Sequence, residues 1–287
     1  MSEITIEQGQ FKSYILRHSQ SQLTIVPERG GLITSWQVGQ DEILYLDRER
    51  FRDRNLSVRG GIPLLFPICG NLPDDTYSLN GKEYHLKQHG FARDLPWLIT
   101  EQSTDGKASI TLSLKSNAET RAVYPFDFQL DFTYILRDNS LELVYRHTNL
   151  SAEAMPFATG IHPYFLVNDK SQLEFDLPSN QYKIKAEPQI HQFSRKFDFT
   201  EEEIDWAFIN LFDNSAKVID RDRNLELTVN YDSEYSTLVF WTIKGKDYYC
   251  LEPWSAPRNA LNTGESILIC EPNQTVTTNI SMVVESL

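Results

Sequence analysis

The fold class is decided by residues 126–149, which read FDFQLDFTYILRDNSLELVYRHTN. Apolar side chains alternate with polar ones on both sides of a polar break at residues 137–140, and they are Phe126, Phe128, Leu130 and Phe132, then Leu141, Leu143 and Tyr145. A period of two puts such side chains on one face of a strand. Because Arg-Asp-Asn-Ser tolerates turn conformations, the segment predicts an antiparallel hairpin with one buried face.

The same alternation recurs on both sides of this hairpin. Ile110, Leu112 and Leu114 precede it, and residues 276–284 form a last alternating strand. A second pair of strands is expected at 225–231 and 238–243, followed by a turn at 244–247 and a strand at 248–251. Helical patterns are short and occur at 117–123 and 200–207, where Asn117 and Thr200 are suitable N-caps.

Many short strands separated by turns, without a βαβ rhythm or a fixed repeat, are typical of a large antiparallel β-sandwich. We therefore expect an all-β fold with few short helices. No Ser- or Gly-rich linker divides the 287 residues, so one domain over 1–287 is expected.

The composition argues against two classes of partner. Twenty-seven Lys and Arg face 40 Asp and Glu, which gives a net charge of −13. Nucleic-acid and membrane-surface proteins need cationic faces, so neither partner is expected.

The chain shows no secretory signal and no apolar run of about 20 residues, which predicts a cytoplasmic protein. Cys69, Cys250 and Cys270 are far apart and are expected to be buried free thiols. The oligomeric state stays open.

Four segments rich in Pro, Gly and aromatic residues interrupt the strand pattern. They are RGGIPLLFP at 59–67, QHGFAR at 88–93, GIHPYF at 160–165 and LEPWSAP at 251–257. Loops held by a rigid sheet commonly carry binding and catalytic groups. We therefore expect the functional residues in these four segments.

In this order, the four segments resemble the motifs of the aldose 1-epimerase (galactose mutarotase) family, and the nearest branch includes hexose-6-phosphate mutarotases. The resemblance runs from Arg59 to Trp254, and the β pattern extends it over nearly the whole chain. It implies the family's galactose mutarotase-like supersandwich, which agrees with the periodicity. It also implies the family reaction, in which the α and β anomers of a sugar interconvert through the open-chain aldehyde.

The resemblance gives two residues catalytic roles. Glu252 would be the general base at the anomeric hydroxyl, and His162 the general acid at the ring oxygen. With ordinary pKa values of about 4.3 and 6.5, a carboxylate and an imidazole suit this exchange near neutrality. The sequence pattern itself places Glu252 at a strand exit. Taken alone, Glu252 could be a surface carboxylate and His162 a core histidine.

Four further residues match substrate-binding positions of the family. His89 would bind a sugar hydroxyl near the ring oxygen, Arg59 would bind substrate, and Asp205 would accept hydrogen bonds from sugar hydroxyls. Arg59 could instead pair with a carboxylate, and the acidic residues 201–203 could make Asp205 part of a solvated face. Arg93 could join Arg59 in holding a 6-phosphate, because guanidinium groups bind phosphate through paired hydrogen bonds.

Other features are given no role in the reaction. Arg258 lies where the chain departs from the family pattern, and it either reaches the site or covers it. The row Arg48, Arg50, Arg52 and Arg54 is expected to be neutralised by its own acidic neighbours. His85 and His89 have an i, i+4 spacing but lie in a Gly-rich segment, so no metal is expected. No nucleotide-binding motif occurs, and no cofactor is expected.

Three functions therefore compete. The first is a mutarotase acting on an aldohexose or a hexose 6-phosphate, whose only partner is that small molecule. The second is a sugar-binding sensor that lacks catalysis. The third is a glycoside hydrolase using Glu252 and Asp205, which would need a defined distance between the two carboxyl groups. The identity of the sugar, and whether it carries a phosphate, stay undecided. A net charge of −13 repels a phosphate unless arginines reverse the local field.

Overall fold

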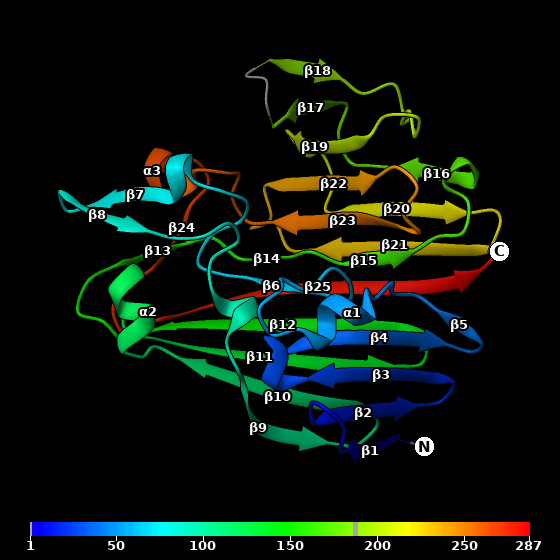
Figure 1. Cartoon of the computed structure of the whole chain (residues 1–287), viewed down its shortest axis with the longest axis horizontal. Coiled ribbons are helices and arrows are strands. Elements are labelled where there is room, and N and C mark those ends of the chain that lie inside the picture. The colour runs from blue at the N-terminus through cyan, green and yellow to red at the C-terminus, as the bar shows by residue number, and fades with distance from the viewer. Residues whose placement is uncertain (1, 186–188) are drawn as a thin grey trace.

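The computed structural model describes residues 2–185 and 189–287. Strands dominate this part of the chain and pair in antiparallel fashion, which confirms the all-β prediction (Figure 1). The N-terminal sheet has the order β1 (Ser2–Glu7), β2 (Ser13–His18), β3 (Ser21–Val26), β4 (Leu32–Val38) and β5 (Asp41–Glu42). It packs against the next sheet through contacts of β2 and β3 with β10 and β11.

Two eight-stranded sheets make up most of the rest. The central sheet has the order β16 (Leu173–Asp176), β20 (Ser215–Asp220), β21 (Leu225–Tyr231), β25 (Thr275–Ser286), β12 (Ser140–Asn149), β11 (Phe128–Arg137), β10 (Ala108–Lys115) and β9 (Leu98–Ser103). The third sheet has the order β18 (Ile190–Gln192), β17 (Gln181–Ile184), β19 (Glu203–Ile209), β22 (Thr237–Ile243), β23 (Tyr248–Trp254), β14 (Gly160–Ile161) and β6 (Leu64–Leu65), with β15 (Tyr164–Leu166) paired to β23.

The remaining elements are short. Two small sheets pair β13 (Met155–Phe157) with β24 (Leu268–Cys270) and β7 (Thr76–Leu79) with β8 (Lys82–His85). The α-helices are α1 (Arg48–Arg52), α2 (Ala118–Val123) and α3 (Ala260–Thr263), and the 3₁₀ turns are Pro27–Arg29, Pro73–Asp75, Ala92–Asp94 and Lys170–Gln172. One apolar cluster includes Leu16, Phe132 and Phe240, so it joins all three large sheets.

The hairpin that opened the sequence analysis is confirmed. β11 and β12 pair with Phe132 opposite Tyr145 and with Arg137 opposite Ser140 at the turn. All seven alternating apolar side chains are buried, at 3% exposure or less. The last strand, β25, pairs with β12 as its other neighbour, which places the C-terminal alternation in the same core.

The prediction that residues 225–231 and 238–243 pair with each other is wrong. β21 pairs with β20 and β25 in the central sheet, whereas β22 lies between β19 and β23 in the third sheet. The hairpin at this point joins β22 to β23 through the turn expected at 244–247. Strand periodicity identifies which face is buried but not which strands pair, since the chain can cross between sheets at any turn.

One of the two helix predictions is correct. The side chain of Asn117 accepts a hydrogen bond from Thr120 N, and Thr120 Oγ1 reciprocates, which caps α2 as expected. Residues 200–207 are not helical, because β19 begins at Glu203. Thr200 instead closes a turn on the Asp198 carboxylate. Ile204 and Phe208 are buried at even positions, which is the strand period that three adjacent glutamates obscured.

The three cysteines are free and buried, as expected. Among the described residues, no helix is long and apolar enough to cross a membrane.

Candidate active site

Strand β23 carries the central carboxylate. All seven of its residues are buried, so both of its faces are covered. Tyr249 and Leu251 point into the main core, whereas Cys250 and Trp254 belong to clusters on the opposite face. Glu252 shares that face because side chains on a strand alternate. It lies within the strand rather than at its exit. The sequence pattern ended the strand early because Pro253 cannot donate a ladder hydrogen bond.

The strand register sets the neighbours of Glu252. Glu252 is opposite Val239 of β22. One step along, Asp205, Trp241, Cys250 and Tyr164 stand opposite one another across β19, β22, β23 and β15. Asp205 therefore belongs to the same polar face as Glu252 and not to a solvated acidic face. The position of Asp205 depends on β19 being a strand.

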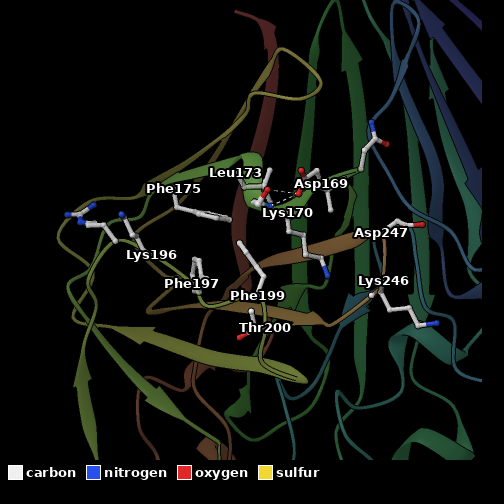
Figure 2. A pocket seen from close by; sticks show the side chains of 15 residues that line it. Asp169, Lys170, Leu173, Phe175, Lys196, Phe197, Phe199, Thr200, Lys246 and Asp247 are labelled. Atoms are coloured by element: carbon white, nitrogen blue, oxygen red, sulfur yellow. Dashed lines mark hydrogen bonds between the residues drawn. The ribbon is translucent and has the colours of Figure 1, made fainter.

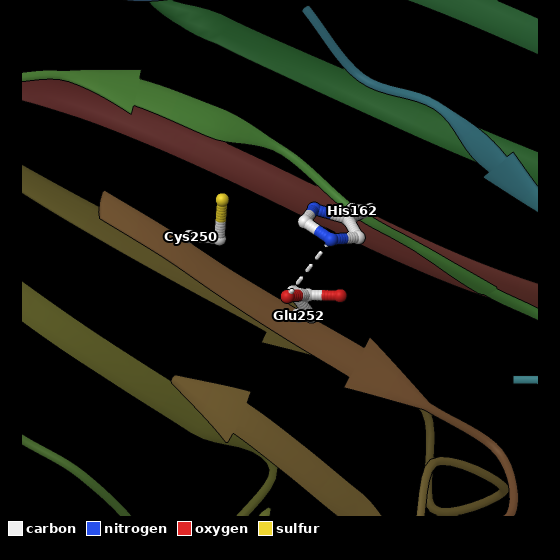
Figure 3. Close-up of side chains that lie close together, drawn as sticks. All are labelled: His162, Cys250 and Glu252. Carbon is white, nitrogen blue, oxygen red and sulfur yellow. Dashed lines mark ion pairs between the residues drawn. The ribbon is translucent and has the colours of Figure 1, made fainter. Parts of the chain in front are cut away.

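His162 reaches this face from the loop between β14 and β15. Its backbone N–H donates to Pro63 O at 3.0 Å, and its ring stacks on Tyr164 with a centroid distance of 4.8 Å and an interplanar angle of 11°. Nε2 lies 3.4 Å from Glu252 Oε1 (Figure 3). The Glu252 side chain is 1% exposed and that of His162 11%, so the pair is nearly removed from solvent.

A cavity of about 330 Å³ contains every predicted site residue. Its lining includes Arg59, His89, Arg93, His162, Asp205 and Glu252, and also Arg258. The structure thus brings together the six predicted site residues, of which the first, Arg59, and the last, Glu252, are 193 positions apart in the sequence. Their individual roles remain predictions. The size suits a small ligand, since such sites commonly measure about 300–1,000 Å³.

The cavity also contains residues outside the predicted catalytic and substrate-binding set. They are Arg50, Ser57, Val58, Gln88, Lys185, Glu203 and Val239, together with the aromatic side chains Tyr164, Trp241 and Trp254. The expectation for the arginine row is wrong in part, because Arg50 lines the cavity and Arg54 pairs with Glu28 at 3.7 Å. Strand alternation could have indicated Trp241 and Trp254, whereas Arg50 and Lys185 carry no local signal.

A larger hollow, of about 680 Å³, lies elsewhere, between the Lys170–Gln172 turn, the 195–200 loop and the 245–247 turn (Figure 2). Phe197 in its wall stacks on Phe240 with the ring centroids 3.8 Å apart. Lys170 Nζ donates to Ile243 O at 2.7 Å, and Asp169 Oδ1 accepts from Ser171. The hollow has no carboxylate–imidazole pair, so the smaller cavity is the better candidate for chemistry.

Burial changes the protonation of the Glu252–His162 pair. It raises the pKa of Glu252 well above its ordinary value, and the Asp205 carboxylate adds to the rise, while Arg258, a hydrogen bond from Trp254 and Arg93 oppose it. Burial lowers the pKa of His162 to about 3, with Arg93 adding to the effect. Isolated groups would leave the shared proton on the imidazole. The opposite shifts reverse this preference: in the empty cavity they favour a neutral His162 and a proton on Glu252.

His89 presents a hydrogen-bond donor to the cavity. Gly70 N–H donates to its Nδ1 at 3.1 Å, so Nε2 carries the proton in the neutral ring. Burial lowers the pKa of His89 well below its ordinary value, and the charge of Arg93 adds to this effect. Neutral His89 can therefore donate from Nε2 to a sugar oxygen.

Arg59 and Arg93 keep unused donors. Within residues 2–185 and 189–287, the Arg59 guanidinium makes no hydrogen bond or ion pair. Arg93 Nη2 donates to Gln88 O at 2.9 Å, but its buried Nε has no partner in the described structure. Two guanidinium groups with free N–H bonds on one wall favour a ligand with several acceptor oxygens. Gly61 turns the chain beside Arg59 at φ +64°, where a Cβ would lie 2.1 Å from Ile33 O.

Arg258 reaches the site rather than covering it. Its Nη2 donates to Asp205 Oδ1 at 2.6 Å. Asp205 therefore offers fewer free lone pairs to a sugar than an unpaired carboxylate would. A hydrolase mechanism with Asp205 and Glu252 is less well supported than a mutarotase mechanism. Of these two carboxylates, Glu252 faces an imidazole that can exchange a proton, whereas Asp205 is paired with Arg258.

Three buried neighbours, two of which line the cavity, have the donor types of a zinc site. Ligand atoms of His162, Cys250 and Glu252 lie within 4.8 Å of one another (Figure 3). Burial raises the pKa of Cys250 well above its ordinary value, which disfavours the thiolate that a metal needs. The two histidines with the i, i+4 spacing lie in different surroundings, because His85 is exposed on β8 and His89 is buried. The expectation of a metal-free site stays a prediction.

Buried Arg29 supports the segment that carries Arg50 and Arg59. Its Nε donates to Phe51 O, and its Nη2 lies 3.3, 3.0 and 2.9 Å from the carbonyl oxygens of Arg50, Asp53 and Leu56. These bonds bind the loop to the N-terminal sheet.

We expect Arg29→Met to loosen residues 50–59. Hydrogen bonds to charged groups contribute about 1.5–3 kcal/mol each, and the variant loses several of them. Hydrogen exchange of the loop amides should accelerate at least about tenfold, and KM should rise more than kcat falls. Arg17→Met, which removes an exposed pair with Glu3, is the control. Unchanged loop exchange would contradict this role.

The layered antiparallel sandwich, with a buried carboxylate and imidazole in a polar cavity, has the fold of galactose mutarotase-like proteins. The comparison with protein families is more specific. The aldose 1-epimerase family model matches residues 12–282, and the chain belongs to that family.

Individual relatives agree with this placement. The Slr1438 protein of Synechocystis sp. PCC 6803 is 44% identical and superposes with a TM-score of 0.92 over 100% of this chain and 96% of that one. A galactose mutarotase-like protein from Clostridium acetobutylicum shares the fold at 20% identity, with a TM-score of 0.83 over 100% and 99% of the two chains. The chromosomal LacX protein of Lactococcus lactis is 27% identical over 88% of each chain.

Proposed function

We propose that the protein is a mutarotase that interconverts the α and β anomers of an aldohexose or its 6-phosphate. The observation that carries this proposal is the 3.4 Å approach of His162 Nε2 to Glu252 Oε1 at the base of a polar cavity. The anomeric hydroxyl and the ring oxygen are bonded to the same carbon. A base and an acid that serve both must therefore lie close together, as these two groups do.

The chemistry follows from this pair. Glu252 takes the proton of the anomeric hydroxyl, and the electrons of that O–H bond form the aldehyde carbonyl. The bond from the anomeric carbon to the ring oxygen breaks, and the ring oxygen takes the proton of His162 Nε2. After rotation about the C1–C2 bond, the same steps run backwards and close the other anomer.

The pair holds one transferable proton throughout. It must lie on His162 when the ring opens, and after opening a proton resides on Glu252, so no proton needs to come from water. The opposite pKa shifts of the two groups favour that proton on Glu252 in the empty cavity, so the reactive form arises when the proton crosses the 3.4 Å contact to His162. Activity should fall at low pH, where both groups are protonated, and at high pH, where neither is.

The cations of the cavity support a phosphorylated substrate. Arg50, Arg59, Arg93, Lys185 and Arg258 line it against three carboxylates, Glu203, Asp205 and Glu252. This local excess offsets the net charge of −13 that would otherwise repel an anion. A relative in Cenchrus ciliaris, 26% identical over 76% of this chain and 67% of its own length, is named a putative glucose-6-phosphate 1-epimerase.

The test compares anomerisation of glucose, galactose and glucose 6-phosphate by one preparation, followed by polarimetry or exchange NMR. We expect acceleration of all three, with the highest kcat/KM for the phosphate. Arg59→Met should raise KM for glucose 6-phosphate about tenfold and leave glucose nearly unchanged, since one charged contact is lost. Arg54→Met, which removes a cation outside the cavity, is the control. Equal effects on both sugars would exclude phosphate recognition by Arg59.

The same comparison separates enzyme from sensor. If the wild-type protein binds a sugar but accelerates none, a sugar-binding function replaces this proposal.

A further inference from the structure

Arg258 contacts two other residues of the cavity, Asp205 and Trp254. Its guanidinium donates to Asp205 of β19 at 2.6 Å and lies 5.1 Å from the ring of Trp254. Trp254 Nε1 in turn donates to Glu252 Oε2 at 3.1 Å. A continuous set of contacts thus runs from Asp205 through Arg258 and Trp254 to the carboxylate of Glu252.

The fold makes room for Arg258. Gly70 has φ +71°, and a Cβ there would lie 2.4 Å from Arg258 Cγ and 3.1 Å from the Trp254 ring. The same Gly70 donates its N–H to His89. Asn259 N–H donates to Asn71 O at 3.2 Å, which fixes the segment after Arg258 beside Gly70. The Arg258 side chain is only 18% exposed, and its buried Nε has no partner in the described part of the chain.

We propose that Arg258 is a positioning residue for the Glu252–His162 pair: it holds Asp205 and Trp254 in place and balances the Asp205 charge beside Glu252. The proposal rests on the mutarotase function for its kinetic readout. It concerns a residue that lies outside the motif set and that contacts neither partner of the pair through a hydrogen bond.

The charges around Glu252 decide the direction of the effect. The acidic groups Asp205 and Glu203 reach the cavity from β19. The cations Arg59 and Arg93 reach it from two loops, and Lys185 reaches it from the end of β17. His162 and Tyr164 come from the β14–β15 segment, Cys250 lies on β23 itself, and Cys69 is close enough to interact electrostatically with Glu252. Arg258 lowers the pKa of both Glu252 and His162, and Asp205 raises that of Glu252. Removing the Arg258 charge should therefore move both limbs of the activity profile to higher pH.

The first variant is Arg258→Met, because methionine keeps an unbranched stem on Trp254 and lacks the charge. We expect kcat/KM to fall about tenfold on the acid limb and to rise on the alkaline limb, because both limbs move to higher pH. Arg258→Lys keeps the charge and should restore most of the acid-limb activity. Arg258→Gln is the second neutral variant if the methionine variant does not fold.

Asp205→Asn supplies the opposite perturbation. It should move the profile to lower pH, and the double variant with Arg258→Met should return it toward the wild-type position. Arg221→Met, which breaks an exposed ion pair with Glu174, is the matched control and should move nothing. Lower activity at every pH without displacement of the limbs would overturn the proposal in favour of direct substrate contact or simple packing.

A second measurement does not depend on activity. Glutamate labelled with ¹³C at Cδ reports each carboxyl titration, and Glu252→Gln identifies the Glu252 signal by its absence. The Glu252 midpoint should rise in Arg258→Met and fall in Asp205→Asn. Unmoved midpoints would refute the role of Arg258. Moved midpoints in a protein that accelerates no anomerisation would refute the proposed function and leave the positioning role standing.

Discussion

Glu252→Gln is expected to lower kcat/KM for anomer interconversion by at least about a hundredfold, because general base catalysis typically contributes about 10² to 10⁴ in rate. Glutamine matches glutamate in shape, and its carbonyl oxygen can still accept the Trp254 N–H that glutamate accepts at 3.1 Å. It cannot take a proton from the anomeric hydroxyl. The measurement is the relaxation of freshly dissolved α-anomer by polarimetry, with the spontaneous rate subtracted.

The control for this variant is Glu174→Gln, which changes an exposed carboxylate on β16 in the same way. Circular dichroism and thermal unfolding should show that both variants fold. Since Glu252 is buried with a raised pKa, its neutralisation should not destabilise the protein. A folded Glu252→Gln protein that retains wild-type acceleration would remove Glu252 from the mechanism.

His162→Gln is expected to lower kcat by about 10² to 10⁴ with a smaller change in KM. Glutamine places an N–H near the position of Nε2, so it can donate a hydrogen bond to the ring oxygen but cannot release the proton. The loss of ring stacking on Tyr164 should lower stability modestly. Saturation kinetics by exchange NMR separates the two kinetic constants.

His89→Gln is the matched comparison, since His89 is the other buried histidine of the cavity. Its predicted role is hydrogen bonding to substrate, so KM should rise more than kcat falls. The reverse pattern in the two variants would exchange the roles of His89 and His162. The double variant of Glu252 and His162 should be no slower than the worse single variant, because one proton must pass through both residues.

The sequence contained the fold class and part of the cavity lining. Alternation within residues 126–149 was sufficient for the hairpin, because burial of one face is a local property of a strand. The four motifs were sufficient to name His162, Glu252 and their neighbours before any geometry was known. All of these residues line one cavity.

The rest depended on relations between distant strands. The path of the chain from β21 to β22 crosses between sheets, and no local pattern records such a crossing. The position of Asp205 is set by the pairing of β19 with β22. The run of glutamates at 201–203 made this strand look helical in the sequence. Arg258 had no assigned role until its contacts with Asp205 and Trp254 were visible.

Strand β23 has a further consequence for how such a protein can change over evolution. Tyr249 and Leu251 lie in the main core, whereas Glu252 and Trp254, on the opposite face, line the cavity. Insertion or deletion of one residue between Tyr248 and Glu252 would turn Glu252 toward the core and an apolar side chain toward the sugar. Such a change would cost both stability and catalysis. Insertions and deletions should therefore be confined to the loops, and changes in substrate specificity should arise in those loops while β23 keeps its length.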